Sequence, residues 1–177
     1  MTFFIEPLSS SHDRAGFACG VEALDRYFHQ QVGQDVRRRV TACFVACETT
    51  TRNVAGFYTL AAASIPLAEM PAPLAKRLPR YPSVPVARLG RLAVATDCHG
   101  RKLGAALLWD AVDRATRSEL AVCALVVDAK DEQAGQFYRH YGFYRVLQQP
   151  ENSDSAVEGG LACSVDSGNS GNRLQAP

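Results

Sequence analysis

Residues 88–112 read RLGRLAV, then ATDCHGRKLG, then AALLWDAV. The first part has the pattern of a strand, the second is a short loop with Gly100 and Gly104, and the third is helix-prone. The first turn of a helix has N–H groups without a partner in the helix, so it attracts anions. Arg101 and Lys102 oppose the helix dipole there unless an anion is bound. The stretch predicts an anion-binding loop, although such a turn is as often only a tight connection.

Two common phosphate-binding motifs are absent from the sequence. The P-loop pattern G-x-x-x-x-G-K-[ST] does not occur, and neither does the dinucleotide-binding pattern G-x-G-x-x-G. The loop at 95–104 therefore predicts neither a P-loop protein nor a dinucleotide-binding fold.

The rest of the chain to residue 147 alternates between strand-like and helix-like patterns. Residues 64–85 carry six of the nine prolines, so we expect mostly loop there, with one helical turn near 74–78. The order strand, helix, strand, helix, strand in the second half predicts a single α/β domain with a central mixed, twisted sheet flanked by helices. The expected strands are 3–8, 41–47, 54–61, 86–94, 121–127 and 143–147, and the expected helices are 21–38, 104–118 and 132–141.

Composition places the chain among cytoplasmic globular proteins. Its 177 residues suffice for one domain, and 47% of them are hydrophobic, with a net charge of +1. No apolar run is long enough to cross a bilayer, and the first residues do not form a signal peptide. The six cysteines form no C-x-x-C pair and the histidines are not spaced for zinc, so we expect reduced cysteines and no metal.

A second stretch, DAKDEQAGQFYRHYGF at 128–143, follows a buried strand. Together the two stretches resemble the GNAT superfamily, which has the loop R/Q-x-x-G-x-G/A, a strand, and then A-x-x-x-Y-x-x-x-G-F. Over about residues 7–147 the chain is most similar to the toxin acetyltransferases of bacterial toxin–antitoxin modules. Four segments carry that resemblance: FACG with LDRYF at 17–28, GFYTL at 56–60, GRLAV at 90–94 and FYRHYGF at 137–143.

The resemblance implies an N-acetyltransferase that uses acetyl-CoA and no metal. Tyr138 matches the tyrosine that protonates the CoA thiolate, and the backbone N–H of Val94 matches the group that polarises the thioester carbonyl. No Ser/His/Asp or Cys/His arrangement stands out, which favours direct attack by the substrate amine. The residues expected to bind acetyl-CoA are Leu92, Ala93, Val94, His99, Gly100, Arg101, Lys102, Leu103, Gly104, Ala105 and Phe137.

The sequence departs from the family pattern in four places. Lys102 replaces the first glycine of the loop, His99 replaces Arg or Gln, and Asp131 replaces an Asn that opens the last helix. The fourth departure is at the end, where 151–177 shows no apolar strand like the family's last one, and a missing strand leaves a sheet edge bare. We expect an acetyltransferase domain at 1–149 and a disordered or altered tail at 150–177.

The resemblance also implies a substrate and partners. These are the α-amine of aminoacyl-tRNA, whose acetylation blocks translation, a homodimeric partner copy and a ribbon-helix-helix antitoxin. The alternatives are another amine acceptor (protein, polyamine or small molecule), or an impaired module that only binds CoA or antitoxin. Cationic side chains could contact tRNA phosphates or simply form a solvated face, and these are Arg37, Arg38, Arg39, Lys76, Arg77, Arg80, Arg88 and Arg91.

Overall fold

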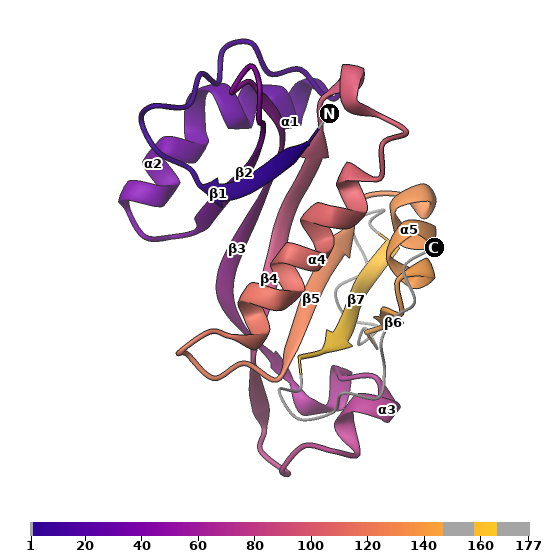
Figure 1. Cartoon of the computed structure of the whole chain (residues 1–177). Helices are drawn as coiled ribbons and strands as arrows, with labels where there is room; N and C mark the ends of the chain where they lie inside the picture. Colours follow the sequence, from indigo (N-terminus) through magenta and orange to yellow (C-terminus); the bar gives the residue numbers. More distant parts are fainter. Residues whose placement is uncertain (1, 147–157, 166–177) are drawn as a thin grey trace. The chain divides into compact units, whose positions relative to one another are not determined.

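The computed structural model describes residues 2–146 and 158–165 (Figure 1). It contains one mixed seven-stranded sheet in the order β1-β2-β3-β4-β5-β7-β6, flanked by helices, which confirms the predicted α/β class. Among the described residues, no helix is both long and apolar enough to cross a membrane. The strands are β1 Phe3–Pro7, β2 Ala42–Glu48, β3 Val54–Pro66, β4 Ser83–Val94, β5 Ala124–Ala129, β6 Tyr144–Arg145 and β7 Glu158–Ser164. The α-helices are α1 Glu22–Arg26, α2 Val32–Arg37, α3 Ala72–Ala75, α4 Leu103–Thr116 and α5 Glu132–His140.

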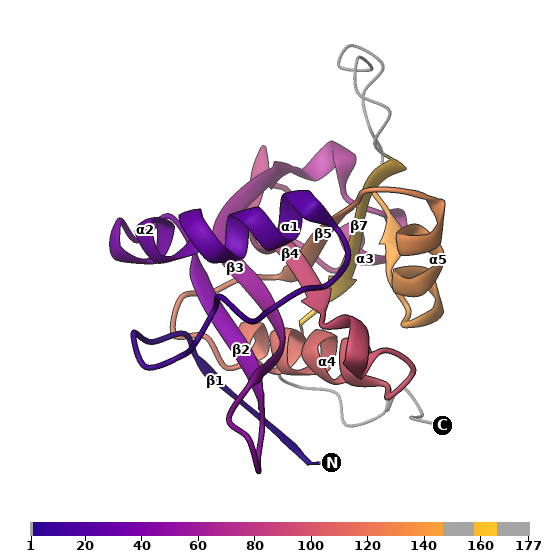
Figure 2. The same cartoon turned by 90° about the horizontal axis from the view of Figure 1, so that it is seen from above.

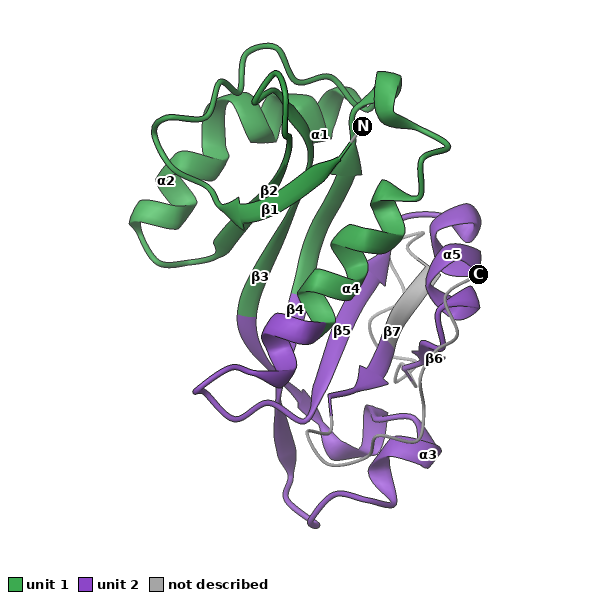
Figure 3. Ribbon diagram, viewed as in Figure 1, with its two compact units in different colours: residues 1–61, 89–112 green, residues 62–88, 113–177 purple. Residues whose placement is uncertain are grey.

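The chain divides into two compact units (Figure 3). The first combines Met1–Ala61 with Leu89–Val112, and the second combines Ala62–Arg88 with Asp113–Pro177. The loop predicted to bind an anion belongs to the first unit, and Tyr138 belongs to the second.

In the first unit, helices cover both faces of the sheet. β1, β2 and β3 form an antiparallel meander, and neighbouring residues of β3 point to opposite faces. The Phe57 ring stacks on Phe28 at a centroid distance of 4.3 Å, whereas the neighbouring Gly56 faces Leu107 of α4. Figure 2 shows α1 and α2 on one side of β3 and α4 on the other. The helix that follows the anion loop is thus held against β3.

The helix predicted at 21–38 is present, but it is not uniform. A π-helical turn, Tyr27–Gln31, separates α1 from α2. This turn buries Tyr27 and Phe28, two of the three aromatic residues of the first family-like segment. Apolar spacing alone does not distinguish a π-turn from an α-helix, because both place these rings on the inner face.

In the second unit, β5 pairs antiparallel with β7, and β7 pairs antiparallel with β6. The α5 helix begins as predicted, because the Asp131 carboxylate accepts a hydrogen bond from the Ala134 N–H at 2.8 Å. The core of this unit consists of Ile65, Met70, Leu74, Val84, Val86, Ala124, Val126, Val146 and Ala162.

The prediction that the last family strand is missing is wrong, whereas the domain boundary at 149 stays a prediction. Glu158–Ser164 forms β7, which lies between β5 and β6 in the sheet. Its sequence, EGGLACS, has too few large apolar residues to read as a strand, and the Gly/Ser-rich flanks hide it. β7 is held by ladder hydrogen bonds on both sides, and a small residue such as Ala162 is fully buried there. The rest of the predicted tail lies outside the described residues.

Two other boundaries differ from the prediction. The proline-rich segment is less loop-like than expected, because β3 extends to Pro66 and β4 already begins at Ser83. Prolines at strand ends do not interrupt a ladder that continues around them. The expected strand at 143–147 is reduced to Tyr144–Arg145, and residue 147 lies outside the described residues.

Candidate functional site

The end of β4 is fixed by three backbone hydrogen bonds. The Ala95 N–H donates to the Ala55 carbonyl of β3 at 2.8 Å, and the Thr96 N–H donates to the Ala18 carbonyl at 3.0 Å. A short 3-10 turn, Thr96–Cys98, follows, closed by the Cys98 N–H on Ala95. The chain therefore leaves β4 along one defined path before it enters the predicted anion loop.

The loop itself contains two left-handed residues, Gly100 at φ +74° and Lys102 at φ +58°. Left-handed residues next to right-handed ones turn successive N–H groups toward one concave side, which is a known anion-binding geometry. The Ala106 N–H bonds to the Lys102 carbonyl at 3.1 Å, so the N–H groups of 103–105 have no partner inside α4. Gly100 has no atom within 4 Å of an added Cβ, so nothing crowds this side of the loop. These features fit the pyrophosphate of acetyl-CoA.

His99 uses one ring nitrogen to hold the loop. Its Nε2 lies 2.9 Å from the Val94 carbonyl oxygen, and since a carbonyl only accepts, Nε2 must carry the proton and donate it. This proton is therefore not available to a phosphate. In this structure the ring ties the loop back to the strand end, whereas the sequence predicted a direct contact with acetyl-CoA.

The first family-like segment supports the same loop. The Asp25 carboxylate accepts a hydrogen bond from the Cys19 N–H at 2.8 Å. The neighbouring Ala18 carbonyl accepts the hydrogen bond from the Thr96 N–H described above. Burial disfavours the charged carboxylate, but hydrogen bonds from the backbone of Cys19 and Gly20 outweigh it and lower the pKa of Asp25. The sequence marked Asp25 only as part of a family-like segment. It did not predict that Asp25 holds the turn that supports the loop.

Tyr138 lies on α5 in the second unit. Its side chain is buried between Phe137 and Phe143, with ring centroids at 5.3 and 5.6 Å. Burial raises its pKa to about 12, so the phenol stays protonated at neutral pH. No described residue hydrogen-bonds its hydroxyl group, so the proton is not committed to an internal acceptor. Phe137 is half-buried beside it.

Cys98 is not suited to be a nucleophile. It is buried under the loop, and burial, together with its hydrogen bond to Asp97, raises the pKa of its thiol. A reactive cysteine needs a lowered pKa and exposure. This thiol therefore packs as a small apolar group.

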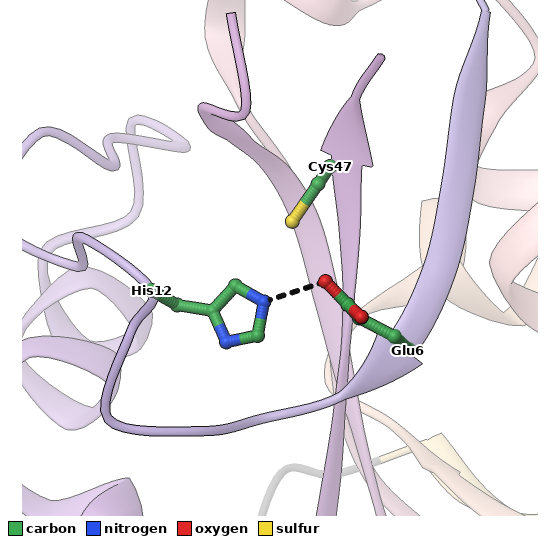
Figure 4. A group of neighbouring side chains, drawn as sticks. All are labelled: Glu6, His12 and Cys47. Carbon is green, nitrogen blue, oxygen red and sulfur yellow. Dashed lines mark hydrogen bonds and ion pairs between the residues drawn. The ribbon is translucent and has the colours of Figure 1, made fainter.

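Figure 4 shows the one group of potential metal ligands within the described residues, formed by Glu6, His12 and Cys47. The His12 Nδ1 accepts from the Ser9 N–H, so Nε2 carries the proton and donates it to Glu6 at 3.0 Å. A metal on Nε2 would require a proton on Nδ1, opposite the Ser9 donor. Burial, followed by the charge of Glu6, raises the pKa of the Cys47 thiol. Hydrogen bonding explains this group without a metal.

The predicted cations fall into different surroundings. Arg88 forms an ion pair with Asp128, which offsets its charge. The Arg91 guanidinium carbon lies 3.6 Å from the centroid of the Tyr27 ring, and the Tyr27 hydroxyl donates to Asp35 at 3.0 Å. Arg91 is thereby held over an aromatic face while remaining exposed, an arrangement suited to a phosphate. The other predicted cations are exposed, namely Arg37, Arg38, Arg39, Lys76, Arg77 and Arg80.

Comparison with known proteins decides the family. Residues 77–157 match the family described as an acetyltransferase (GNAT) domain. A tRNA-acetylating toxin of Mycobacterium tuberculosis is 33% identical over 138 residues, which are 77% of this chain and 81% of that protein. The chain belongs to the GNAT acetyltransferases. It lies close to the tRNA-acetylating toxins within that family.

Solved structures of GNAT acetyltransferases agree with this assignment. AtaT complexed with acetyl-methionyl-tRNAfMet is 29% identical with a TM-score of 0.81, over 92% of this chain and 95% of AtaT. A mutant AtaT toxin bound to the C-terminus of the antitoxin AtaR is 26% identical with a TM-score of 0.73, over 92% of this chain and 93% of that one. The predicted enzyme class and co-substrate, an N-acetyltransferase that uses acetyl-CoA, are confirmed.

Proposed function

We propose that this acetyltransferase is a toxin that acetylates the α-amine of aminoacyl-tRNA in the cytoplasm and thereby blocks translation. The observation that carries the proposal is the 33% identity to a tRNA-acetylating toxin over most of both chains. The described loop and α4 supply an anion site, and Arg91 supplies an exposed, oriented cation in the same unit. The loop suits the pyrophosphate of acetyl-CoA, whereas Arg91 supports a substrate rich in phosphate.

The loop binds the pyrophosphate of acetyl-CoA in this proposal. The N–H groups at the start of α4 point at it, and Arg101 and Lys102 add two positive charges. His99 acts indirectly, because its ring holds the loop against Val94. Leu92, Ala93 and Val94 of β4, with Leu103, Gly104 and Ala105 of α4, complete the cofactor contacts from this unit.

Two groups of the chain assist the chemical step. The neutral substrate amine attacks the thioester carbonyl carbon, a C–N bond forms, and the C–S bond breaks. The Val94 N–H stabilises the negative charge on the carbonyl oxygen, a contribution of a few kcal/mol in comparable sites. The Tyr138 hydroxyl gives its proton to the departing thiolate, and the amine gives its proton to solvent. The Tyr138 phenolate then takes up a proton from solvent, which restores the acid for the next turnover. Phe137 shields this hydroxyl group from water.

The proposed partners follow from the same relatives. We include an antitoxin, because a mutant of the relative AtaT is seen with the C-terminus of the antitoxin AtaR. The ribbon-helix-helix fold of this antitoxin and a second copy of the chain are included on the family resemblance alone. The alternative of an impaired module was based on the apparent absence of the last strand. Since β7 is present in the sheet, this reason no longer applies. Another amine acceptor remains the competing function.

The test is transfer of radiolabelled acetyl from acetyl-CoA to bulk aminoacyl-tRNA by the parent, Tyr138→Phe and Tyr144→Phe. Tyr144 is the matched control, since it is an exposed tyrosine of the same unit. We expect labelled aminoacyl-tRNA from the parent and control, and a loss of about a hundredfold in kcat for Tyr138→Phe. If the enzyme binds acetyl-CoA but labels only other amines, aminoacyl-tRNA is not its acetyl acceptor and the proposed substrate is wrong.

The pH profile tests the acid separately. Because Tyr138 stays protonated up to a pKa of about 12, it causes no alkaline decline in kcat/KM between about pH 7 and about pH 10. Over that range the rate should instead rise as the substrate amine loses its proton. An alkaline limb in the parent that disappears in Tyr138→Phe would show that this tyrosine ionises far below its expected pKa.

A further inference from the structure

A surface pocket of about 820 Å³ lies in the second unit, before β4. Its apolar lining includes Leu67, Leu78 and Pro82, and its polar lining is Tyr81, Lys76 and Arg80. Two of the predicted phosphate contacts, Lys76 and Arg80, thus belong to one pocket, together with an aromatic ring that the sequence analysis did not single out.

The segment that forms this pocket is fixed to the core. Met70 and Leu74 are buried beneath it, and the Leu67 N–H bonds to the Pro82 carbonyl at 3.1 Å, which closes the segment. Further backbone bonds run from Leu78 to Ala75 and from Tyr81 to Pro79. The lining is therefore preformed, so a ligand does not have to pay for ordering it.

Its charge is entirely positive. Neither Lys76 nor Arg80 has a carboxylate partner among the described residues, and no carboxylate occurs among the lining residues. Tyr81 is 63% exposed, so its ring is accessible beside two cations that have no carboxylate partner in the described part of the chain. An unpaired nucleotide needs both features, since its base stacks on an aromatic ring and its phosphate pairs with cations.

A peptide fits less well. An added peptide strand needs a free sheet edge, but β3 and β4, which flank the segment, both have neighbours on each side. A peptide helix needs a row of apolar anchor sites, and this lining offers two leucines and a proline beside its cations.

We propose that this pocket binds an unpaired nucleotide of the RNA substrate, with its base on Tyr81 and its phosphate between Lys76 and Arg80. The proposal rests on the proposed function and extends it, because it gives the enzyme a contact with single-stranded RNA outside the acetyl-transfer chemistry. The 3′ end of tRNA, which carries the reacting amine, is unpaired and has this chemistry.

The experiment measures binding by fluorescence anisotropy with two labelled RNAs, a hairpin ending in an unpaired CCA and the same hairpin without it. The variants are Tyr81→Leu, Tyr81→Trp, the double variant Lys76→Ser/Arg80→Ser, and Tyr144→Leu as the exposed-tyrosine control. We expect Tyr81→Leu to bind the CCA hairpin about tenfold more weakly, and Tyr81→Trp and Tyr144→Leu to bind it like the parent. The parent and the Tyr81 and Tyr144 variants should all bind the hairpin without CCA with the same affinity.

Salt dependence separates stacking from charge. The double variant should lower the slope of log Kd against log salt by about 0.7, because the two cations share one phosphate and each phosphate contact with a single strand adds about 0.7. Tyr81→Leu should leave the slope unchanged. Circular dichroism of each variant establishes that the fold is intact, and Tyr81→Trp provides the rescue if Tyr81→Leu is unstable.

Equal binding of both hairpins by all variants, with acetyl transfer to aminoacyl-tRNA intact, would overturn the pocket and leave the proposed function standing. A parent that binds neither RNA would overturn the RNA substrate itself. Two other results would also overturn the pocket assignment. In the first, Tyr81→Leu binds RNA like the parent but no longer binds the antitoxin. In the second, Tyr81→Leu binds RNA like the parent but sediments as a monomer where the parent sediments as a dimer.

Discussion

Lys102 adopts a backbone conformation that the family pattern reserves for glycine. At φ +58° a side chain with a Cβ costs about 1–2 kcal/mol, and this explains why a glycine is usual there. The residue adds a positive charge at the start of α4 in return. Backbone strain is thus located at the loop that we assign to the pyrophosphate.

Two substitutions separate the backbone from the charge. Lys102→Gly removes the strain and the charge, whereas Lys102→Ala removes only the charge. We expect Lys102→Gly to raise the free energy of unfolding by about 1 kcal/mol relative to Lys102→Ala, measured by urea denaturation. The KM for acetyl-CoA should rise equally in both. A stability that is the same in both variants would contradict the strained backbone.

At the scale of elements, β3 brings the two helical layers of the first unit together. Gly56 lets α4 approach, because a Cβ there would lie 2.9 Å from Leu107 Cδ1 and 3.0 Å from the Ala93 carbonyl oxygen. Phe57 packs on the opposite face against Phe17 and Phe28. The family-like segment at 56–60 is therefore a packing motif. Its contacts with α4 and β4 position the end of β4 at Val94.

Gly56→Ala tests this packing. The added methyl group must displace Leu107 or the β4 backbone, so we expect a loss of about 1–3 kcal/mol in unfolding free energy and a raised KM for acetyl-CoA. Gly16→Ala is the control in the same unit, since its nearest atom, an Asp13 oxygen, lies at 4.0 Å. A Gly56→Ala enzyme with unchanged KM and stability would show that α4 does not depend on this contact.

The elements that the sequence predicted well are those with strong local patterns. The strand–loop–helix at 88–112 and the cap at Asp131 follow from periodicity and capping chemistry. The anchoring of the loop by the Thr96–Ala18 hydrogen bond and the stacking of Arg91 on Tyr27 could not be predicted, because each joins residues far apart in sequence. The roles proposed for Val94 and Tyr138 remain predictions.

At the scale of the whole molecule, the sheet depends on β7. Each side of this strand pairs with another, so its loss would expose an edge of β5 and detach β6. The sequence did not predict β7, because a strand of small residues is fixed by its neighbours rather than by its own apolar pattern.

Ala162→Asp tests the position of β7. Ala162 is fully buried, so an unpaired carboxylate there should unfold the second unit or lower the thermal midpoint by more than about 10 °C. Ala162→Ser has nearly the same size and should lower it by only a few degrees. Circular dichroism and limited proteolysis give the comparison. An Ala162→Asp protein that melts like the parent would place this residue at the surface.

The strand order also has a consequence in time. Synthesis proceeds from the N-terminus, so α5 and β6 leave the ribosome before the strand that holds β6 in the sheet. Since α5 also packs on β7, the helix that carries Tyr138 gains its full support only after residue 164 has emerged. In the proposed mechanism, the nascent chain would therefore be unable to transfer acetyl groups until this late strand is in place.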